Sequence, residues 1–465
     1  MAAPEKIEAI LSHPLTHLIL RLLTKKMGGR SILGDILYWY GREGIPLSRR
    51  LLYLLPFYLI DLIRRRAGAS REAVRARLDH TPTFRALINT ARSIGRFGLT
   101  KPQKFIFPLS VVWNFTQACN LRCVHCYQDA ARPLPDELTL EEQYRVVDEL
   151  IANDAVLLAF AGGEPLMSKN FWPVAERASR GGLHITVATN GTLLSKDVVR
   201  RMREVGVGYV EVSLDSIYPE KHNGFRGKDS WERTVKGIEN AVAQSGLQVG
   251  IASCITRMNF EELEGLINFA REVGANKFYA FNFIPTGRGK DVINLDLTPQ
   301  MREEMLEILT RHLNEGRIQI FSIAPQFGRS CLSLYGTGGL ITTGHYGAGS
   351  GKGAEIFAKY IGGCGTSRCY LAIQPDGKVT PCVFIPIVVG NIRERSLVEI
   401  WNTSPVLEAL RTRDDNWGHC GTCDYRYNCG GCRARAYGYF NDIKGPDPGC
   451  IYNQDYWEGL TSTCQ

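Results

Sequence analysis

From residue 110 to residue 320 the sequence alternates short runs of β-branched and aromatic residues with longer amphipathic stretches. The short runs are six candidate strands, at 110–116, 155–162, 184–190, 209–215, 248–254 and 277–285. Helical patterns follow them, for example at 139–153, 195–206, 230–245 and 259–274. Strands that alternate with helices of this length are typical of βαβ units and a parallel sheet. An α/β fold is therefore expected for this part of the chain.

Polar residues gather where the candidate strands end. They are Gly162 to Glu164 after the second run, Thr189 and Asn190 after the third, and Ser213 and Asp215 after the fourth. In parallel α/β barrels the chemistry lies at the carboxyl ends of the strands. The sequence therefore predicts a functional site at that edge.

The strongest motif follows the first candidate strand. It consists of Cys119, Cys123 and Cys126, with three and then two residues between the cysteines. A loop with this spacing can hold three corners of a cubane iron–sulfur cluster and leave the fourth iron open, as a catalytic metal requires. The alternative is a zinc site with His125 as the fourth ligand. His125 lies between two of the cysteines, however, where it is expected to point away from their common centre.

The chain contains 14 cysteines, and its first residues, MAAPEKIEAI, carry acids and lack the long apolar run of a signal peptide. We therefore expect a cytoplasmic protein with reduced thiols, in which clustered cysteines serve as metal ligands. Residues 1–100 hold 17 basic and 7 acidic residues, whereas the rest of the chain holds 38 and 40. The positive charge is thus remote from the expected site, which argues against nucleic acid as a partner.

Cys119-x3-Cys123-x2-Cys126 followed by Tyr127 resembles the radical S-adenosylmethionine (SAM) superfamily, over about residues 108–320. The resemblance implies a partial (β/α)6 TIM-like barrel with a [4Fe–4S] cluster on the three cysteines. Gly162, Gly163 and Glu164 match the motif that binds the methionine amino group. By similarity, Asn190, Ser213 and Asp215 approach the ribose and carboxylate of SAM, and Tyr127 lies near the adenine.

The reaction that this resemblance implies is reductive cleavage of SAM to a 5′-deoxyadenosyl radical, which removes a hydrogen atom from an unactivated carbon. The expected electron donor, on the same grounds, is a small ferredoxin or flavodoxin. The rival hypothesis is a non-catalytic iron–sulfur protein that carries electrons. It would require a degenerate cofactor pocket, yet Glu164, Asn190, Ser213 and Asp215 are all present.

Eight further cysteines follow the predicted barrel and resemble the SPASM extension of this superfamily. The resemblance implies two auxiliary [4Fe–4S] clusters, which would make three clusters in all. The first would be held by Cys364, Cys369, Cys382 and Cys432, and the second by Cys420, Cys423, Cys429 and Cys450. The spacing between Cys429 and Cys432 is two residues where the family commonly has three, which puts the assignment near Cys432 in question. Full ligation by eight thiolates favours electron transfer over substrate coordination, and two structural zinc sites are the alternative.

The predicted domains are a helical basic extension at 1–104, the radical SAM barrel at 105–325, a glycine-rich segment at 326–360 and the SPASM domain at 361–465. Residues 328–353 contain nine glycines, which suit either a lid or a flexible connector.

The N-terminal extension contains a thirteen-residue apolar core between arginines, within residues 49–66. The core is interrupted by Pro56 and Asp61 and is shorter than the ~20 residues that span a bilayer. It suits peripheral contact with a membrane surface, or a helical cap on the barrel with solvated arginines. No winged-helix pattern for capturing a leader peptide is present.

The substrate is predicted only as a class. The stretch Gly430-Gly431-Cys432-Arg433-Ala434-Arg435-Ala436 resembles superfamily members that modify tetrapyrrole side chains. Peptide modification is the close second, because it is the commonest activity of SPASM enzymes, and a membrane lipid is third.

A few residues outside these motifs carry separate expectations. His222 and Arg226 resemble a recurrent pattern after the fourth strand, which either stabilises a loop over the cofactor or is purely structural. Cys254 is expected to be a buried small hydrophobic residue. Cys331 is expected to be inert, with a radical relay as the alternative, and Cys464 is expected to be inert.

Overall fold

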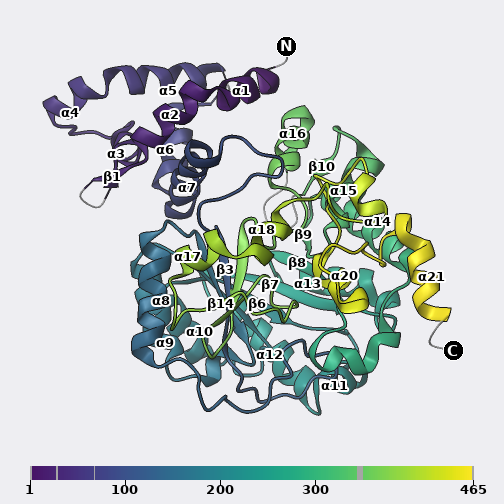
Figure 1. The fold of residues 1–465 in the computed structure, drawn as a ribbon. Helices are drawn as coiled ribbons and strands as arrows, with labels where there is room; N and C mark the ends of the chain where they lie inside the picture. Colours follow the sequence, from purple (N-terminus) through teal and green to yellow (C-terminus); the bar gives the residue numbers. More distant parts are fainter. Residues whose placement is uncertain (1–2, 28–29, 67–68, 343–348, 463–465) are drawn as a thin grey trace.

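The computed structural model describes all residues except 1–2, 28–29, 67–68, 343–348 and 463–465. Its main sheet contains ten strands in the order β14-β13-β12-β3-β4-β5-β6-β7-β8-β9 (Figure 1). Strands β3 to β9 are parallel, so the expected α/β partial barrel is confirmed as an open sheet. These strands are β3 (Ser110–Thr116), β4 (Leu157–Gly162), β5 (His184–Thr189), β6 (Val207–Ser213), β7 (Gln248–Ile255), β8 (Lys277–Asn282) and β9 (Gln319–Ser322).

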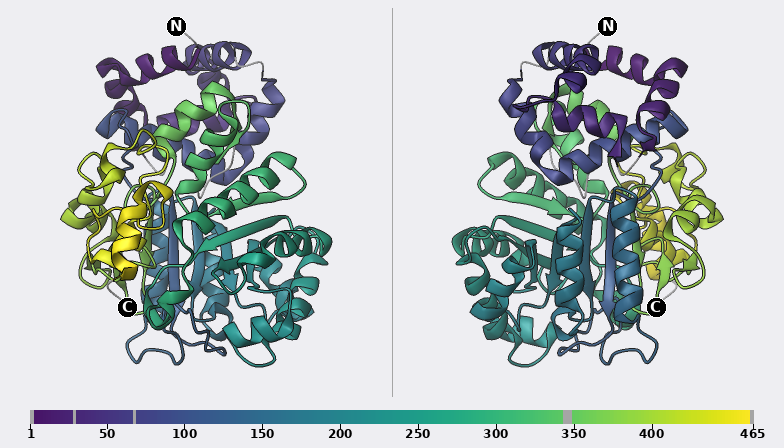
Figure 2. Two further views of the ribbon diagram at one scale, coloured as in Figure 1. Left: turned by 90° about the vertical axis from the view of Figure 1, so that its right-hand side faces the viewer. Right: turned by 90° about the vertical axis from the view of Figure 1, so that its left-hand side faces the viewer.

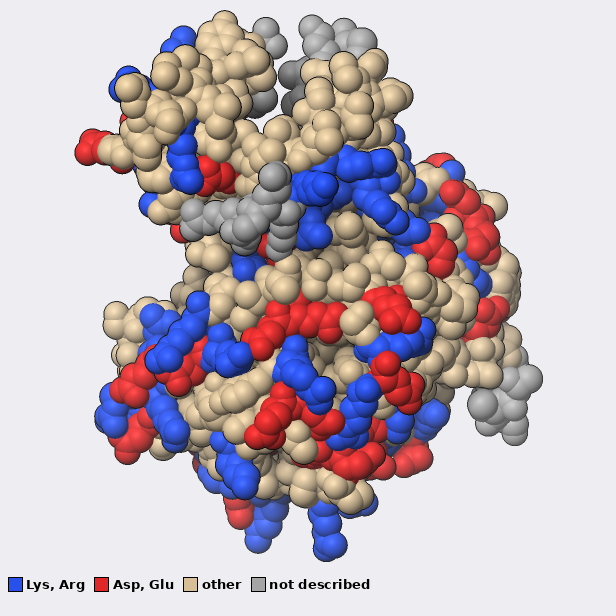
Figure 3. Space-filling view, turned by 60° about the vertical axis from the view of Figure 1, so that its left-hand side comes forward, with Lys and Arg blue, Asp and Glu red and all other residues tan. Residues whose placement is uncertain are grey.

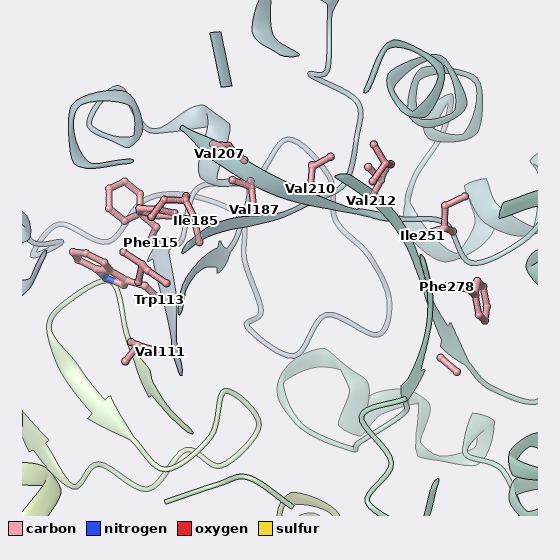
Figure 4. Close-up of a cluster of buried hydrophobic side chains, with 14 of the residues drawn as sticks. Val111, Trp113, Phe115, Ile185, Val187, Val207, Val210, Val212, Ile251 and Phe278 are labelled. Atoms are coloured by element: carbon pink, nitrogen blue, oxygen red, sulfur yellow. The ribbon is translucent and has the colours of Figure 1, made fainter. Parts of the chain in front are cut away.

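Side chains alternate between the two faces of this sheet. Those on one face pack against helices, and Figure 4 shows Val111, Trp113 and Phe115 of β3 together with Val210 and Val212 of β6 in that layer. Residues between them line a cavity on the other face. The covering helices are α8 (Leu140–Ala152), α9 (Phe171–Arg180), α10 (Lys196–Glu204), α12 (Ser230–Val242), α13 (Leu263–Glu272) and α14 (Pro299–Glu315).

The N-terminal extension forms a separate helical layer (Figures 1 and 2). Its elements are α1 (Ala3–Ser12), α2 (Pro14–Leu23), α3 (Ile32–Trp39), α4 (Leu47–Leu52), α5 (Leu54–Arg66), α6 (Arg71–Asp79), α7 (Thr81–Phe97) and a short hairpin, β1 (Lys26–Met27) with β2 (Arg30–Ser31), which the sequence did not predict. Helix α7 is fixed to the amino ends of the strands, because Arg85 donates hydrogen bonds to the carbonyls of Ala155 and Ile151. No helix among the described residues is long and apolar enough to cross a bilayer.

The glycine-rich segment is more structured than its composition indicates. It begins with helix α15 (Gln326–Tyr335), whose first six residues are buried, and continues through the short pair β10 (Leu340–Ile341) and β11 (Gly349–Ser350). Helix α16 (Gly351–Ile361) follows. Apolar side chains such as Phe327 place the start of this segment in the core.

The C-terminal region extends the same sheet. Strand β12 (Tyr370–Ile373) pairs in parallel with β3, and β13 (Lys378–Thr380) and β14 (Gly390–Asn391) follow in antiparallel pairing. The buried Trp401 donates its indole N–H to the carbonyl of Phe105 at 2.8 Å. The helices are α17 (Leu397–Thr403), α18 (Pro405–Arg411), α19 (His419–Thr422), α20 (Arg433–Phe440) and α21 (Gln454–Ser462).

Candidate functional site

A cavity of about 1480 Å³ lies on the inner face of the sheet. Its wall includes all three cysteines of the loop after β3 and four of the C-terminal cysteines. The opposite end is lined by residues at the amino ends of the strands and by residues of α1, α7 and α16. The cavity exceeds the roughly 300–1,000 Å³ of common ligand pockets, so it has room for more than one small molecule.

The loop that carries Cys119, Cys123 and Cys126 is held by Arg288. The Arg288 backbone N–H donates to the carbonyl of Cys126 at 3.0 Å, and its Nε donates to the carbonyl of Cys123 at 2.9 Å. Burial raises the pKa of the Cys119 thiol to about 11, and the nearby Glu164, Cys123 and Cys126 add to this shift. The three thiols therefore face a common space.

The two glycines after β4 allow this strand end to lie against the cysteine loop. The Gly163 N–H donates to the carbonyl of Thr116, and the Glu164 N–H donates to that of Ala118, each at 2.8 Å. A Cβ at Gly163 would collide with the Ala118 carbonyl, and Gly162 has a φ of 113°. Only glycine combines this backbone conformation with so close an approach.

Glu164 is fully buried, and its carboxylate does not line the cavity. It accepts hydrogen bonds from the Thr189 hydroxyl and the Asn190 backbone N–H, both at 2.9 Å. Burial raises the pKa of Glu164 to about 7. Asn190 does line the cavity, and its side-chain amide lies 4.0 Å from the Cys119 sulfur. In this structure Glu164 thus orients Asn190 from behind the wall.

Asp215 is also behind the wall and not in it. Its carboxylate accepts from Arg226 Nε at 2.6 Å and from the Cys254 backbone N–H at 2.8 Å, and its own N–H donates to His222 Nδ1. Burial opposes ionisation of Asp215, but Arg226 holds its pKa below the usual value. Arg226 and Ser213 line the cavity, so the site that the sequence assigned to Asp215 presents Arg226 instead.

His125 does not turn toward the three cysteine sulfurs as a fourth zinc ligand would. Its Nε2 lies 3.4 Å from Asp215, and its ring packs on Phe225 with the ring centroids 4.3 Å apart. Burial lowers the pKa of His125 to about 4.

Tyr127 joins the barrel to the C-terminal region. Its hydroxyl donates to Asn114 Oδ1 at 3.0 Å, and its ring contacts Phe384 with the centroids 4.9 Å apart. Tyr127 also lines the cavity beside the cysteine loop. The wall there is thus shared by the two regions of the chain.

A second group of thiols lines the same cavity and consists of Cys364, Cys369, Cys382 and Cys432. Burial raises the pKa of Cys382 to about 12, and the nearby Cys364 adds to this shift. The Tyr370 hydroxyl donates to the Cys382 sulfur at 3.8 Å.

The third group lies in a separate small pocket and consists of Cys420, Cys423, Cys429 and Cys450. Cys420 accepts hydrogen bonds at its sulfur from the Asp447 N–H and the Asn453 amide, both at 3.4 Å. The Asp447 carboxylate in turn accepts from the Cys432 N–H at 2.7 Å, so Asp447 links the second and third groups.

The donor chemistry of the three groups fits iron–sulfur clusters. All thirteen cysteines that the structure describes are free thiols. Burial raises the pKa of thiols in each group, as at Cys119, Cys382 and Cys450, so a thiolate there needs a compensating positive charge, which cluster iron supplies. In the described parts of the chain, no three His, Cys, Asp or Glu side chains could hold a single metal ion.

The remaining cysteines differ from one another. Cys254 is largely buried, as expected, but it also lines the cavity, because the alternation of side chains along β7 turns Ala252 and Cys254 inward. Cys331 is fully buried in α15 among core residues, as an inert thiol would be. Cys464 lies outside the described residues.

Sequence reasoning missed several residues of the cavity wall. Lys277 and Tyr279 of β8 and Glu211 of β6 line it near the amino ends of the strands. Lys277 Nζ lies 4.4 Å from the centroid of the Tyr209 ring, and burial lowers the pKa of this lysine. Burial raises the pKa of Glu211 to about 7. The sequence signal that could have identified them is the polar residues at alternate positions of strands β6 and β8, which are otherwise apolar.

The arginines of the 430–436 stretch do not face the cavity. Arg435 is fully buried and forms ion pairs with Asp447 at 3.3 Å and with Asp296 at 3.7 Å. Arg433 donates to the backbone carbonyls of Ile443 and Gly445. The two arginines are therefore structural, whereas Cys432 and Ala434 of the same stretch line the cavity.

Two protein-family models match the chain. The model described as the radical SAM superfamily matches residues 113–270, and the model described as an iron–sulfur cluster-binding domain, SPASM, matches residues 364–424. The cysteines of the third group beyond residue 424 lie outside the second match.

Individual proteins are similar over most of the chain. An AdoMet-dependent heme synthase of Methanosarcina barkeri is 33% identical over 356 residues, which cover 74% of this chain and 97% of that protein. Mycofactocin maturase MftC of Mycobacterium tuberculosis is 28% identical over 74% of this chain and 83% of its own. The crystal structure of Streptococcus suis SuiB bound to S-adenosylmethionine has a similar fold, with a TM-score of 0.65 at 15% identity over 90% of this chain and 93% of its own.

Proposed function

Because this chain belongs to the radical SAM superfamily and carries the SPASM extension, we propose that it removes a hydrogen atom from a tetrapyrrole side chain. The observation that carries the choice of substrate class is the 33% identity to a heme synthase over 97% of that protein. The cofactors are S-adenosylmethionine and [4Fe–4S] clusters.

Each thiol group would hold one cluster. The catalytic cluster is assigned to Cys119, Cys123 and Cys126, the first auxiliary cluster to Cys364, Cys369, Cys382 and Cys432, and the second to Cys420, Cys423, Cys429 and Cys450. The reduced catalytic cluster, when bound, supplies the electron that cleaves SAM. Four thiols at each auxiliary site leave no free iron position, which favours electron transfer.

The residues that would contact SAM are those that line the cavity beside the three cysteines, namely Tyr127, Gly162, Gly163, Asn190, Ser213 and Arg226. Glu164 and Asp215 act from behind this wall in the proposal. Glu164 orients Asn190 through its backbone N–H, and Asp215 orients Arg226. A direct bond from Glu164 to the cofactor's amino group would require its carboxylate to become accessible.

The cavity offers a lysine that suits a substrate with carboxylates. Lys277 lines it, and among the described residues no acidic oxygen lies within ion-pair distance of this lysine. Arg226 and Arg288 also line the cavity, but they are paired with Asp215 and Asp129. Aromatic side chains, including Tyr279 and Phe321 stacked 4.9 Å apart, supply flat apolar walls. A porphyrin with propionate side chains combines both properties.

A peptide is the second candidate substrate, since the 28% identical mycofactocin maturase supports it. A small ferredoxin or flavodoxin is the proposed electron donor for either substrate. Contact with a membrane surface through residues 49–66 is a separate proposal, because it concerns the N-terminal helices and not the cavity.

The test is an anaerobic titration of the reconstituted enzyme with the iron complex of a porphyrin that carries propionates. We expect tight binding, a rise in 5′-deoxyadenosine formation, and at least tenfold weaker binding for Lys277→Ala. The matched control is Lys236→Ala, an exposed lysine on α12. Stimulation by a precursor peptide but not by the porphyrin would favour the second candidate. SAM cleavage absent under every condition would support the electron-carrier hypothesis.

A further inference from the structure

The N-terminal extension exposes an unusual amount of apolar surface. Of the 25 large hydrophobic side chains exposed among the described residues, 13 lie between residues 10 and 59. Single exposed leucines are normal on soluble proteins, but a contiguous patch marks an interaction surface.

The exposed residues follow helical periodicity. On α2 they are Leu15, Leu18, Ile19 and Leu22, at spacings of three and four that place them on one face. The opposite face of α2 packs on α7, where a Cβ at Gly95 would approach the Arg21 backbone N to 2.9 Å. The apolar stripe is therefore turned away from the rest of the protein.

Helices α4 and α5 present a second stripe, defined here as the leucine face: Leu51, Leu52, Leu54, Leu55, Tyr58 and Leu59. Leu52 and Leu55 are 70% and 67% exposed. Polar groups of this region are instead turned inward, since the Tyr40 hydroxyl donates to Asp61 at 2.6 Å and the Tyr53 hydroxyl donates to Asp35 at 2.8 Å. The apolar-outward arrangement is thus built by specific internal hydrogen bonds.

The leucine face is not a cap on the barrel. Helix α5 packs mainly on α4 and α6, and α7 forms the contact with the strands. Figures 1 and 2 show α4 and α5 at the outer edge of the molecule, and the top of Figure 3 is mostly uncharged, with a group of basic side chains beneath it.

Basic side chains flank these stripes. Lys25, Arg50 and Arg65 are exposed, and the structure gives none of the three an acidic partner among the described residues. Residues 1–100 carry 17 basic and 7 acidic residues, whereas the rest of the chain is close to neutral. At 13 residues α5 is about 20 Å long, too short to cross the ~30 Å apolar core of a bilayer.

We propose that the leucine face docks on the surface of an anionic phospholipid bilayer. Its leucines insert among the lipids, and Arg50 and Arg65 contact the headgroup phosphates. An apolar face with flanking cations and few acids is what such a surface binds. This proposal concerns the N-terminal helices and is independent of the substrate.

The test is co-sedimentation of the full-length protein with vesicles of phosphatidylcholine alone or mixed with phosphatidylglycerol. We expect binding to the mixed vesicles that weakens at high salt. Leu55→Gln/Leu59→Gln should reduce the partition coefficient at least tenfold, and Leu55→Phe/Leu59→Phe should retain it. The control Leu87→Gln/Leu334→Gln alters two exposed leucines on α7 and α15 and should bind normally.

A charge-reversal pair tests the electrostatic contribution without touching any buried group. Arg50→Glu/Arg65→Glu should lose at least fivefold in binding to the anionic vesicles, whereas Lys169→Glu/Arg317→Glu, on exposed sites of the barrel, should not. Failure of the unaltered protein to bind either vesicle would overturn the proposal. A second result would also overturn it: no vesicle binding, together with self-association in sedimentation velocity that Leu55→Gln/Leu59→Gln abolishes. The leucine face would then join two copies of the chain.

Discussion

Arg226 Nε donates to Asp215 Oδ2 at 2.6 Å, and both side chains are almost fully buried. This ion pair joins the end of α11 (Pro219–Arg226) to the residues that follow β6. Because Arg226 also lines the cavity, the pair fixes a cationic group of the wall beside the loop of Cys123.

The first prediction is that Arg226→Gln destabilises the protein by about 3–5 kcal/mol, because it leaves the buried Asp215 carboxylate without its partner. Denaturant unfolding measures this loss. The double variant Arg226→Gln/Asp215→Asn should recover part of it, since no charge is then stranded. If His222→Ala and Arg226→Ala both cleave SAM at the wild-type rate, then His222 and Arg226 have no role toward the cofactor.

The second prediction concerns Glu211, whose pKa burial raises from 4.5 to about 7. Between these values the folded state binds more protons than the unfolded state, so stability falls as pH rises from 4.5 to 7 and then levels off. Glu211→Gln removes this dependence. The stability of the variant minus that of the unaltered protein should therefore be about 2–3 kcal/mol larger at pH 8 than at pH 5. A stability difference between the two proteins that does not change with pH would contradict the raised pKa of Glu211.

The third prediction is that Gly163→Ala displaces the cysteine loop, because the added Cβ meets the carbonyl of Ala118. Overpacking of this kind costs about 1–3 kcal/mol. SAM affinity should fall at least tenfold, as measured by equilibrium dialysis of the reconstituted protein. Gly459→Ala is the control, since a Cβ there meets nothing within 4 Å. Equal SAM affinities in the two variants would refute the role of the close approach.

The strands and helices of the barrel could be predicted because local and tertiary signals agree. The run 110–116 is a strand over the same residues, and the pattern at 139–153 is helix α8, which Thr139 and Glu142 begin with a capping box. Strand β9 was missed because its four residues are too short to show a period. The two-residue strands of the N-terminal hairpin escaped for the same reason.

The site could be predicted as a set of residues but not as a surface. Spacing brings the cysteines together, yet it does not reveal that Glu164 and Asp215 face away from the cavity while Arg226 faces into it. That difference depends on which partner each carboxylate finds after folding. The sequence likewise did not show that Cys254 lines the cavity, since an apolar run does not tell which face of the sheet is hollow.

The fourth prediction separates structure from recognition at Arg435. Arg435→Met should lower the unfolding free energy by about 3–5 kcal/mol, because Asp447 and Asp296 lose a buried partner. The enzyme that remains folded should keep the KM of the unaltered enzyme for its substrate, as steady-state kinetics at low temperature would measure. A raised KM with unchanged stability would instead indicate that Arg435 takes part in substrate binding.

Iron content combined with SAM cleavage tests the central claim most directly. Three clusters predict about 12 irons per chain after anaerobic reconstitution, with 5′-deoxyadenosine formed on reduction. Cys123→Ala should abolish cleavage while retaining about eight irons, whereas Cys423→Ala should lose about four irons, those of the third group. A full iron complement without any cleavage of SAM by the unaltered protein would contradict the account.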